Sequence, residues 1–130
     1  MQGLVDQLDA GYQEVMGLYG QLLALAKSMA QSLEAGQWET IDAQLGEKQV
    51  IIDTIGAKEG ELAEVREKLR EELGLKTFSL EQLRSRLPIT ELSNTMAQLM
   101  EVLQELEEWE RNNEEILRKL VAGVQSQLED

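Results

Sequence analysis

Apolar residues recur at alternating spacings of three and four through the first quarter of the chain. Further apolar residues flank this seam on both sides, which gives the broad face of a coiled-coil-like helix. A helix with so wide an apolar face is expected to contact two other helices rather than one. Three glycines inside the segment either permit a close approach by a neighbouring helix or are simply tolerated there. The seam residues are Val5, Leu8, Tyr12, Val15, Tyr19, Leu22, Ala26, Met29 and Leu33, and the glycines are Gly11, Gly17 and Gly20.

Gly36 marks the end of this helix, which we predict over residues 3–35. Glycine adopts the left-handed conformation that closes a helix without a steric penalty. A second helix follows at once over residues 37–73, with Trp38 at its start and Gly74 after its end. We interpret Trp38 as a residue of the core or of the helix joint, which packs back on the end of the first helix and contacts no partner.

The segment that follows the second helix has the sequence of a capped connector. Ser79 and Gln82 form a capping box, in which the serine side chain accepts a hydrogen bond from the backbone N–H three residues on. We therefore predict a short helix over residues 80–87, which stops before Pro88. Residues 74–90 carry three basic residues against one acidic residue, and they are the only net-basic part of the chain. This connector lets the chain return alongside the first two helices.

A third long helix is predicted over residues 90–126, with Thr90 as its N-cap and with fraying expected from Ser126 to Asp130. Two polar residues interrupt its apolar stripe, and a second, shifted stripe opens around them. A stripe that drifts across a helix indicates that the helix changes partner along its length, or that part of its face awaits a partner. The first stripe is Leu92, Met96, Leu99, Leu103, Leu106, Glu110, Asn113, Leu117, Leu120 and Val124, and the shifted stripe is Val102, Leu106, Trp109, Asn113, Ile116 and Leu120.

The composition supports an all-α fold and leaves little room for catalysis. Helix-forming residues predominate, and the chain of 130 residues contains one proline. We predict a single domain over residues 1–130, an elongated antiparallel helical bundle of three long helices with a short connecting helix. Cysteine and histidine are both absent, which excludes disulfides, thiol nucleophiles and metal sites built on those side chains. We therefore expect no enzyme activity, no cofactor and no bound metal.

The chain is strongly acidic, with a net charge of −13. Such a balance repels nucleic-acid phosphates and anionic lipids, so neither is expected as a partner. The N-terminal residues lack the basic region and apolar run of a secretory signal, and no apolar stretch approaches the roughly 18 residues of a membrane span. These features predict a soluble cytoplasmic protein without membrane insertion.

Three features of the third long helix bear on binding. The glutamates between residues 107 and 115 are interpreted as a solvated face, because no glycine-kinked loop or histidine accompanies them. Trp109 lies on the shifted stripe, where a tryptophan suits either a partner site or the core. Asn113 lies on both stripes, and it either sets the register of the core or donates a hydrogen bond to a bound peptide backbone.

Three stretches of the chain carry a family resemblance. They are LLALA at residues 22–26 continuing to LEAGQWE at 33–39, EKQVIIDTI at 47–55, and RNNEEIL at 111–117. In their order and spacing they resemble the FlgN family of flagellar type III export chaperones. The chain departs from the family at Gln37, where an acidic or short polar residue is usual at the helix start. It also has no tyrosine in its C-terminal third, where the resemblance would place a contact with the export gate.

The resemblance implies a cytoplasmic chaperone that binds the C-terminal segments of the hook–filament junction proteins, FlgK and FlgL. It would prevent their early assembly and deliver them to the export apparatus. Recognition would then be helix-in-groove binding by the C-terminal part of the third helix. We expect a monomer or a weak homodimer. The residues that we assign to partner binding are Leu106, Trp109, Asn113, Ile116, Leu120 and Val124.

Two other interpretations stay open. The chain could be another type III chaperone, of the FliT or FliS kind. It could instead be a structural coiled-coil protein whose third-helix stripe forms the seam of a homodimer. A monomer that forms a stable heterodimer with a junction-protein C-terminus favours the chaperone, whereas a tight dimer that ignores this segment favours the structural protein.

Overall fold

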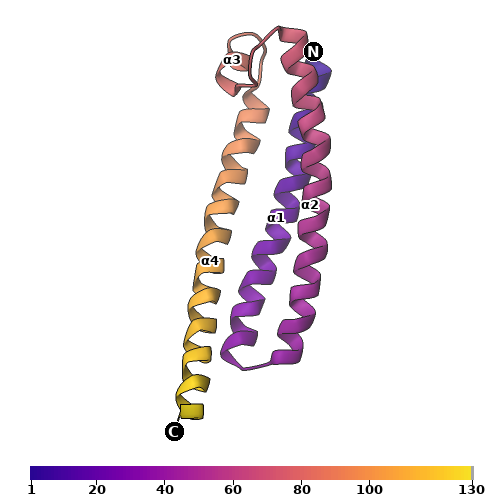
Figure 1. The fold of residues 1–130 in the computed structure, drawn as a ribbon. Coiled ribbons are helices and arrows are strands. Elements are labelled where there is room, and N and C mark those ends of the chain that lie inside the picture. The colour runs from indigo at the N-terminus through magenta and orange to yellow at the C-terminus, as the bar shows by residue number, and fades with distance from the viewer. Residues whose placement is uncertain (130) are drawn as a thin grey trace.

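The fold is an all-α bundle of three long helices and one short one (Figure 1). The computed structural model describes residues 1–129. Figure 1 shows the three long helices side by side, with the short helix and its flanking loops gathered at one end. The predicted fold class is confirmed. The helices are α1 (Gln2–Glu34), α2 (Trp38–Leu73), α3 (Leu80–Arg84) and α4 (Thr90–Glu129).

α1 lies between the other two long helices and packs along both, whereas α2 and α4 scarcely approach each other. α1 and α2 run in opposite directions. Near one end of this pair Arg66 donates to the Tyr12 hydroxyl at 2.7 Å, and near the other end Gln44 donates to the Ser28 hydroxyl at 3.0 Å. The first helix therefore contacts two helices, as its broad apolar face predicted.

α1 and α4 run in the same direction and keep one register. The Thr95 hydroxyl donates to Asp9, 86 residues earlier, and Asn113 Nδ2 donates to the Ala26 carbonyl, 87 residues earlier. Adding 87 to 34 places Glu34, the last residue of α1, level with residue 121 of α4. The last turns of α4 therefore extend beyond the end of α1, and Figure 1 shows this overhang below the corner between α1 and α2.

The ends of α1 and α2 follow the glycine signals in the sequence. Gly36 and Gly74 both have a φ of +66°, in the left-handed region. Each closes its helix with a Schellman pattern; after α1, Gly36 donates to the Leu33 carbonyl and Gln37 to the Ser32 carbonyl. This turn shifts the predicted bounds by one residue on either side of the corner. Gln37 provides no side-chain cap for α2.

The short helix ends earlier than predicted. The Ser79 hydroxyl accepts from the Gln82 N–H at 3.5 Å, as the capping box predicted. α3 nevertheless ends at Arg84 rather than at residue 87. The Ser85 hydroxyl donates to the Gln82 carbonyl at 2.7 Å, and the chain continues in turns to the following proline, which disfavours helical backbone in the residue before it.

α4 is longer than predicted. It begins at Thr90 as expected, but the N-cap position is Ile89, whose carbonyl accepts the first intrahelical hydrogen bond at 2.8 Å. The helix continues through Glu129, three residues beyond the predicted end. The fraying expected from Ser126 concerns motion and stays a prediction. No proline or cluster of turn-forming residues interrupts the backbone hydrogen bonds there. Asp130 lies outside the described residues.

The apolar core is concentrated at the end of the bundle that holds α3. Leu83 of α3 is fully buried and closes this end. A smaller cluster follows further along α1 and α4. The main cluster consists of Val5, Leu8, Val15, Leu62, Leu69, Leu73, Leu75, Leu83, Ile89, Leu92 and Leu99, and the smaller one of Leu22, Ala26, Ile55 and Leu106.

Among the three glycines of α1, Gly11 is the one that packing requires. A Cβ at this position would overlap the side chain of Leu62, whereas Gly17 and Gly20 face open space. The backbones of α1 and α2 therefore approach closely at Gly11. The other two glycines are simply tolerated in the helix.

Candidate partner-binding site

The last turns of α4 carry a stripe of large apolar side chains that no other helix covers. We call residues 117–129 the α4 tail, and Leu117, Val121, Val124 and Leu128 the tail stripe. All four side chains are exposed, and Leu128 reaches 81%. Their spacing of four, three and four continues the apolar stripe that α4 buries against α1 further up. The tail stripe is therefore a helix-packing surface without a packing helix.

A hollow at the α1–α2 corner adjoins this stripe. We call it the corner groove, and its volume is about 380 Å³. Met29 and Leu33 of α1, both buried, form its floor together with Ile41 of α2. The complete lining is Met29, Leu33, Trp38, Ile41, Asp42, Leu45, Glu110, Asn113, Glu114 and Leu117. Leu117 belongs to both the groove and the tail stripe, so the two surfaces are continuous.

Three exposed apolar side chains converge on the corner groove from opposite sides. Trp38 and Leu45 come from α2, and Leu117 comes from α4. Trp38 is 53% exposed, so of its two predicted places the core is wrong, and it lies at the joint between α1 and α2. The hydrogen bond between Gln44 and Ser28 places the first turn of α2 level with the last turn of α1, at the open end of the bundle. The indole ring lines the groove there.

The rim of the corner groove is acidic. Asp42 of α2 and Glu110 and Glu114 of α4 all line it. Lys48 donates to Glu110 at 3.0 Å and joins α2 to α4 at one end of the hollow. Glu114 and Asp42 take part in no ion pair among the described residues. The groove thus combines an apolar interior with a net negative edge.

Asn113 forms the polar part of the groove floor. Its side chain is buried, and its Nδ2 donates to the Ala26 carbonyl of α1 at 2.9 Å. This bond fixes the register between α1 and α4, which was one of the two roles considered for Asn113. Its Oδ1 has no hydrogen-bond partner among residues 1–129. A buried acceptor without a donor is unfavourable by roughly 1–3 kcal/mol.

The six residues that the sequence analysis assigned to partner binding lie in different parts of the structure. Leu106 is buried in the smaller core cluster, and half-buried Trp109 packs against that cluster. Asn113 lies in the groove floor. Ile116 and Leu120 are half-buried, and Val124 is exposed on the tail stripe. The structure therefore brings Asn113 and Val124 to the groove and the tail stripe, and it places Leu106 inside the bundle.

Several residues of this surface were not anticipated. They are Trp38 and Leu45 of α2, and Leu117, Val121 and Leu128 of α4. The heptad of α4 does include Leu117, and spacings of four and eleven from it lead to Val121 and Leu128. That signal predicts an apolar stripe but not its exposure, because exposure depends on how α1 and α2 pack beside α4.

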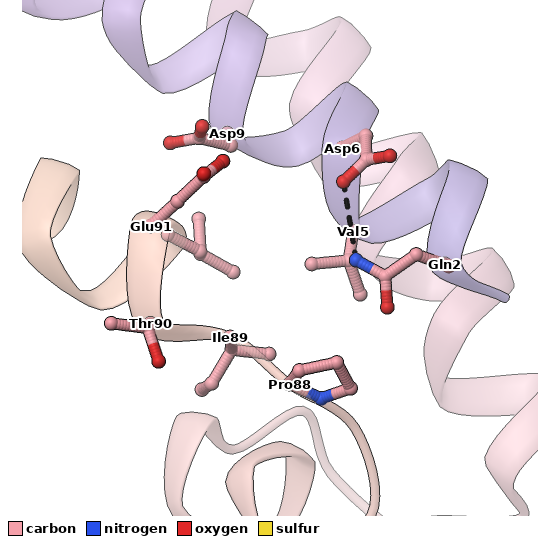
Figure 2. A pocket seen from close by; sticks show the side chains of 9 residues that line it. Gln2, Val5, Asp6, Asp9, Pro88, Ile89, Thr90 and Glu91 are labelled. Carbon is pink, nitrogen blue, oxygen red and sulfur yellow. Dashed lines mark hydrogen bonds between the residues drawn. The ribbon is translucent and has the colours of Figure 1, made fainter.

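A second hollow lies at the opposite end of α1 (Figure 2). Its volume is about 280 Å³, and its lining includes the carboxylates of Asp6, Asp9 and Glu91. Figure 2 shows the Glu91 side chain reaching toward Asp9 across the gap between α4 and α1. Gln2 donates to Asp6 at 3.2 Å, and Thr95 donates to Asp9. Asp6 and Asp9 therefore have donors within the protein.

The acidic side chains of the described residues do not gather into a metal site. No group of three acidic, cysteine or histidine side chains among residues 1–129 is arranged to hold a metal ion. The glutamates of α4 are divided among separate ion pairs, with Glu107 bonded to Arg111 and Glu110 to Lys48. None of the described helices combines the length and the apolar character that crossing a membrane requires.

Comparison of the chain with protein-family models, with curated proteins and with solved structures finds no match. Membership of the FlgN family therefore stays a prediction. The corner groove and the tail stripe are features of the structure that do not depend on a family assignment. They form one continuous apolar surface with an acidic rim.

Proposed function

We propose that this protein binds an amphipathic helix of another protein and catalyses no reaction. One observation supports this most strongly: α4 continues its apolar stripe along the last turn of α1 and beyond it, and the four side chains of this stripe are exposed. A helical segment laid on the tail stripe would extend the line of α1. Recognition of this kind uses anchors at helical spacing, which the stripe provides.

The tail stripe can supply useful binding free energy. Complete burial of a large aliphatic side chain is worth roughly 1.5–3 kcal/mol. The four side chains are between 43% and 81% exposed, so a partner can remove much of their surface from water. Part of this gain offsets the loss of freedom on association. A moderate, reversible affinity follows, which suits a protein that must release what it holds.

In its specific form, the proposal is a cytoplasmic export chaperone of the FlgN kind. Its partners would be the C-terminal segments of hook–filament junction proteins, FlgK-like or FlgL-like, which it would keep from early assembly and deliver to the export apparatus. The resemblance of residues 22–55 and 111–117 supports this choice. The position of the uncovered surface at the C-terminal end of the last long helix agrees with it.

Calorimetry with the full chain and junction-protein C-terminal segments tests the proposal. Val124→Glu places a charge in the tail stripe and should weaken binding about tenfold or more, since a buried unpaired charge is costly. Val50→Glu is the matched control, because Val50 is 66% exposed on α2 and lines neither surface. Binding that is absent in the unsubstituted chain, or equal in both variants, would contradict the proposal.

A homodimer is the main alternative, since two tail stripes could cover each other. Sedimentation of the unsubstituted chain over a range of concentrations separates the two cases. A tight dimer that persists when a junction-protein segment is added would favour a structural coiled-coil protein. Preference for a different export substrate in calorimetry would instead favour a chaperone of the FliT or FliS kind.

A further inference from the structure

We infer that the corner groove receives one large apolar side chain from the partner, and that basic residues flank this anchor on a helix of about three turns. The inference rests on the proposed function and adds the chemistry of the partner. The groove includes Trp38 and Leu45 of α2, whereas the partner-binding residues predicted from the sequence all lie on α4.

The shape of the groove fits a single bulky side chain. Its volume is about 380 Å³, whereas a cavity of about 150 Å³ is enough to hold a benzene ring. Trp38, Leu45 and Leu117 wall it with exposed carbon atoms. Elsewhere on the described surface, Val50 and Met100 are exposed but lie apart from it. A ring placed in the groove would bury surface from three side chains at once.

The charge of the rim selects the flanking residues. Asp42 and Glu114 line the groove on opposite sides, and neither is bonded to a cation of this chain. Residues 91–130 contain ten acidic residues against three basic ones, so a second copy of α4 would meet like charge. Complementary potentials favour a basic partner and disfavour a self-associated one.

The length of the partner helix follows from the tail stripe. From Leu117 to Leu128 is 11 residues, which correspond to about 16 Å of helix. Because Leu117 is shared with the groove, the anchor lies at the end of the partner helix nearest the corner.

Tryptophan signals can report directly on the groove. The chain has two tryptophans, and Trp109→Phe leaves Trp38 as the only indole. The probe is a synthetic helical peptide of about 12 residues that contains no tryptophan. Leucine and phenylalanine form one face of this helix, and lysines flank that face. The control peptide has the same sequence with each lysine replaced by glutamate. The lysine peptide should shift the Trp38 emission to shorter wavelength and bind at least about tenfold more tightly than the glutamate peptide.

If Trp109→Phe fails to fold, NMR of the unsubstituted chain gives the same information. Two indole N–H signals are expected, and Trp38→Phe assigns them. The lysine peptide should move the Trp38 signal more than the Trp109 signal. Equal binding of both peptides, or a Trp38 signal that does not respond, would overturn the inference.

Charge variants test the rim separately from the apolar wall. Combined Asp42→Asn and Glu114→Gln should weaken the lysine peptide about tenfold, since two close charge pairs are lost. Combined Glu64→Gln and Glu72→Gln removes the same charge from an exposed face of α2 outside the groove, and it should have a much smaller effect. Equal losses in both double variants would mean that net charge alone attracts the peptide.

The two proposals fail in different ways. If junction-protein segments bind and Trp38→Ser leaves their affinity unchanged, the groove inference is wrong while the chaperone stands. If the lysine peptide shifts Trp38 but junction-protein segments do not bind, the chaperone fails and the groove stands. A Trp38 shift that depends only on the concentration of the chain would assign the groove to a second copy and overturn the inference.

Discussion

The two ends of this bundle use the same helix pattern for opposite purposes. At the end that holds α3, the α4 stripe is buried, and Leu8, Leu69 and Leu83 are 0% exposed. At the other end the same stripe continues into exposed residues of the α4 tail. The seam residues have the same spacing throughout. Exposure therefore depends on the lengths of the neighbouring helices and not on the pattern itself.

The closed end also has polar groups that hold it in place. Arg86 donates to the Leu73 carbonyl at the end of α2, and Arg70 donates to the Leu75 carbonyl just beyond it, both at 2.8 Å. These bonds satisfy carbonyls that a helix end leaves free. At the corner end Gln37 makes no side-chain cap for α2, and the polar bonds of Gln44 and Lys48 lie further along that helix. One end is built for stability, and the other leaves apolar surface available.

Core truncation should give the largest difference between the ends. Leu8→Ala removes a fully buried side chain and should lower the free energy of unfolding by about 2–5 kcal/mol. Leu128→Ala removes a side chain that is 81% exposed and should change it by less than about 0.5 kcal/mol. Urea unfolding of both variants measures the contrast. A loss for Leu128→Ala comparable to that for Leu8→Ala would show that another surface covers the tail.

Substituting alanine for glycine should have a smaller effect, and the effect should differ between the bundle and the tail. Gly11→Ala would press a Cβ into buried Leu62 and should destabilise the fold by about 1–2 kcal/mol, since overpacking exceeds the gain in helix propensity. Gly123→Ala in the tail faces open space. It should leave global unfolding unchanged and slow amide exchange around residue 123.

The same tail substitution connects stability with binding. A tail that is more helical before binding loses less freedom when it meets a partner, so Gly123→Ala should tighten the partner complex. Gly17→Ala is the control inside the bundle, because it also faces open space. It should raise global stability by up to about 1 kcal/mol and leave partner affinity unchanged. If both variants bound the partner more tightly, the gain in affinity would not come from helical order in the tail.

Local signals predicted most of the fold. Gly36 and Gly74 correctly predicted two helix ends, and Ser79 correctly predicted the start of α3. These signals are local, because each residue caps a helix through its own backbone or through that of residues nearby. The early end of α3 was missed by three residues, since turns continue the chain after Arg84 without a helix. The central position of α1 followed from the width of its apolar face.

The candidate site was predicted only in part, because it depends on register. The shifted stripe drew attention to Leu106, which α1 covers. Trp38 was assigned to the core or the helix joint, and it lies at the joint, half-exposed. The parallel offset between α1 and α4 decides which seam residues of α4 are covered. No single segment of the sequence contains that offset.

A titration at the closed end should give the smallest effect. Two hydrogen bonds from Arg70 hold the pKa of the exposed Glu67 carboxyl below its ordinary value of 4.5. A lowered pKa means that the carboxylate stabilises the fold above that ordinary value and that this contribution disappears as the pH falls through the lowered pKa. Wild-type protein should therefore unfold at slightly more urea than Glu67→Gln at pH 7, and the difference should vanish in acid.

Glu64→Gln is the matched control for this titration, since Glu64 is exposed on the same helix and forms no ion pair among the described residues. At pH 7 its unfolding midpoint should lie close to that of wild type, since the substitution breaks no ion pair. Salt at about 1 M should also reduce the Glu67 difference, because the pair is exposed and screened. A difference that survives both acid and salt would mean that Glu67 supports the end of α2 by packing of its side chain rather than by charge. The closed end would then owe its stability to apolar contacts throughout, and the contrast with the corner end would be one of coverage alone.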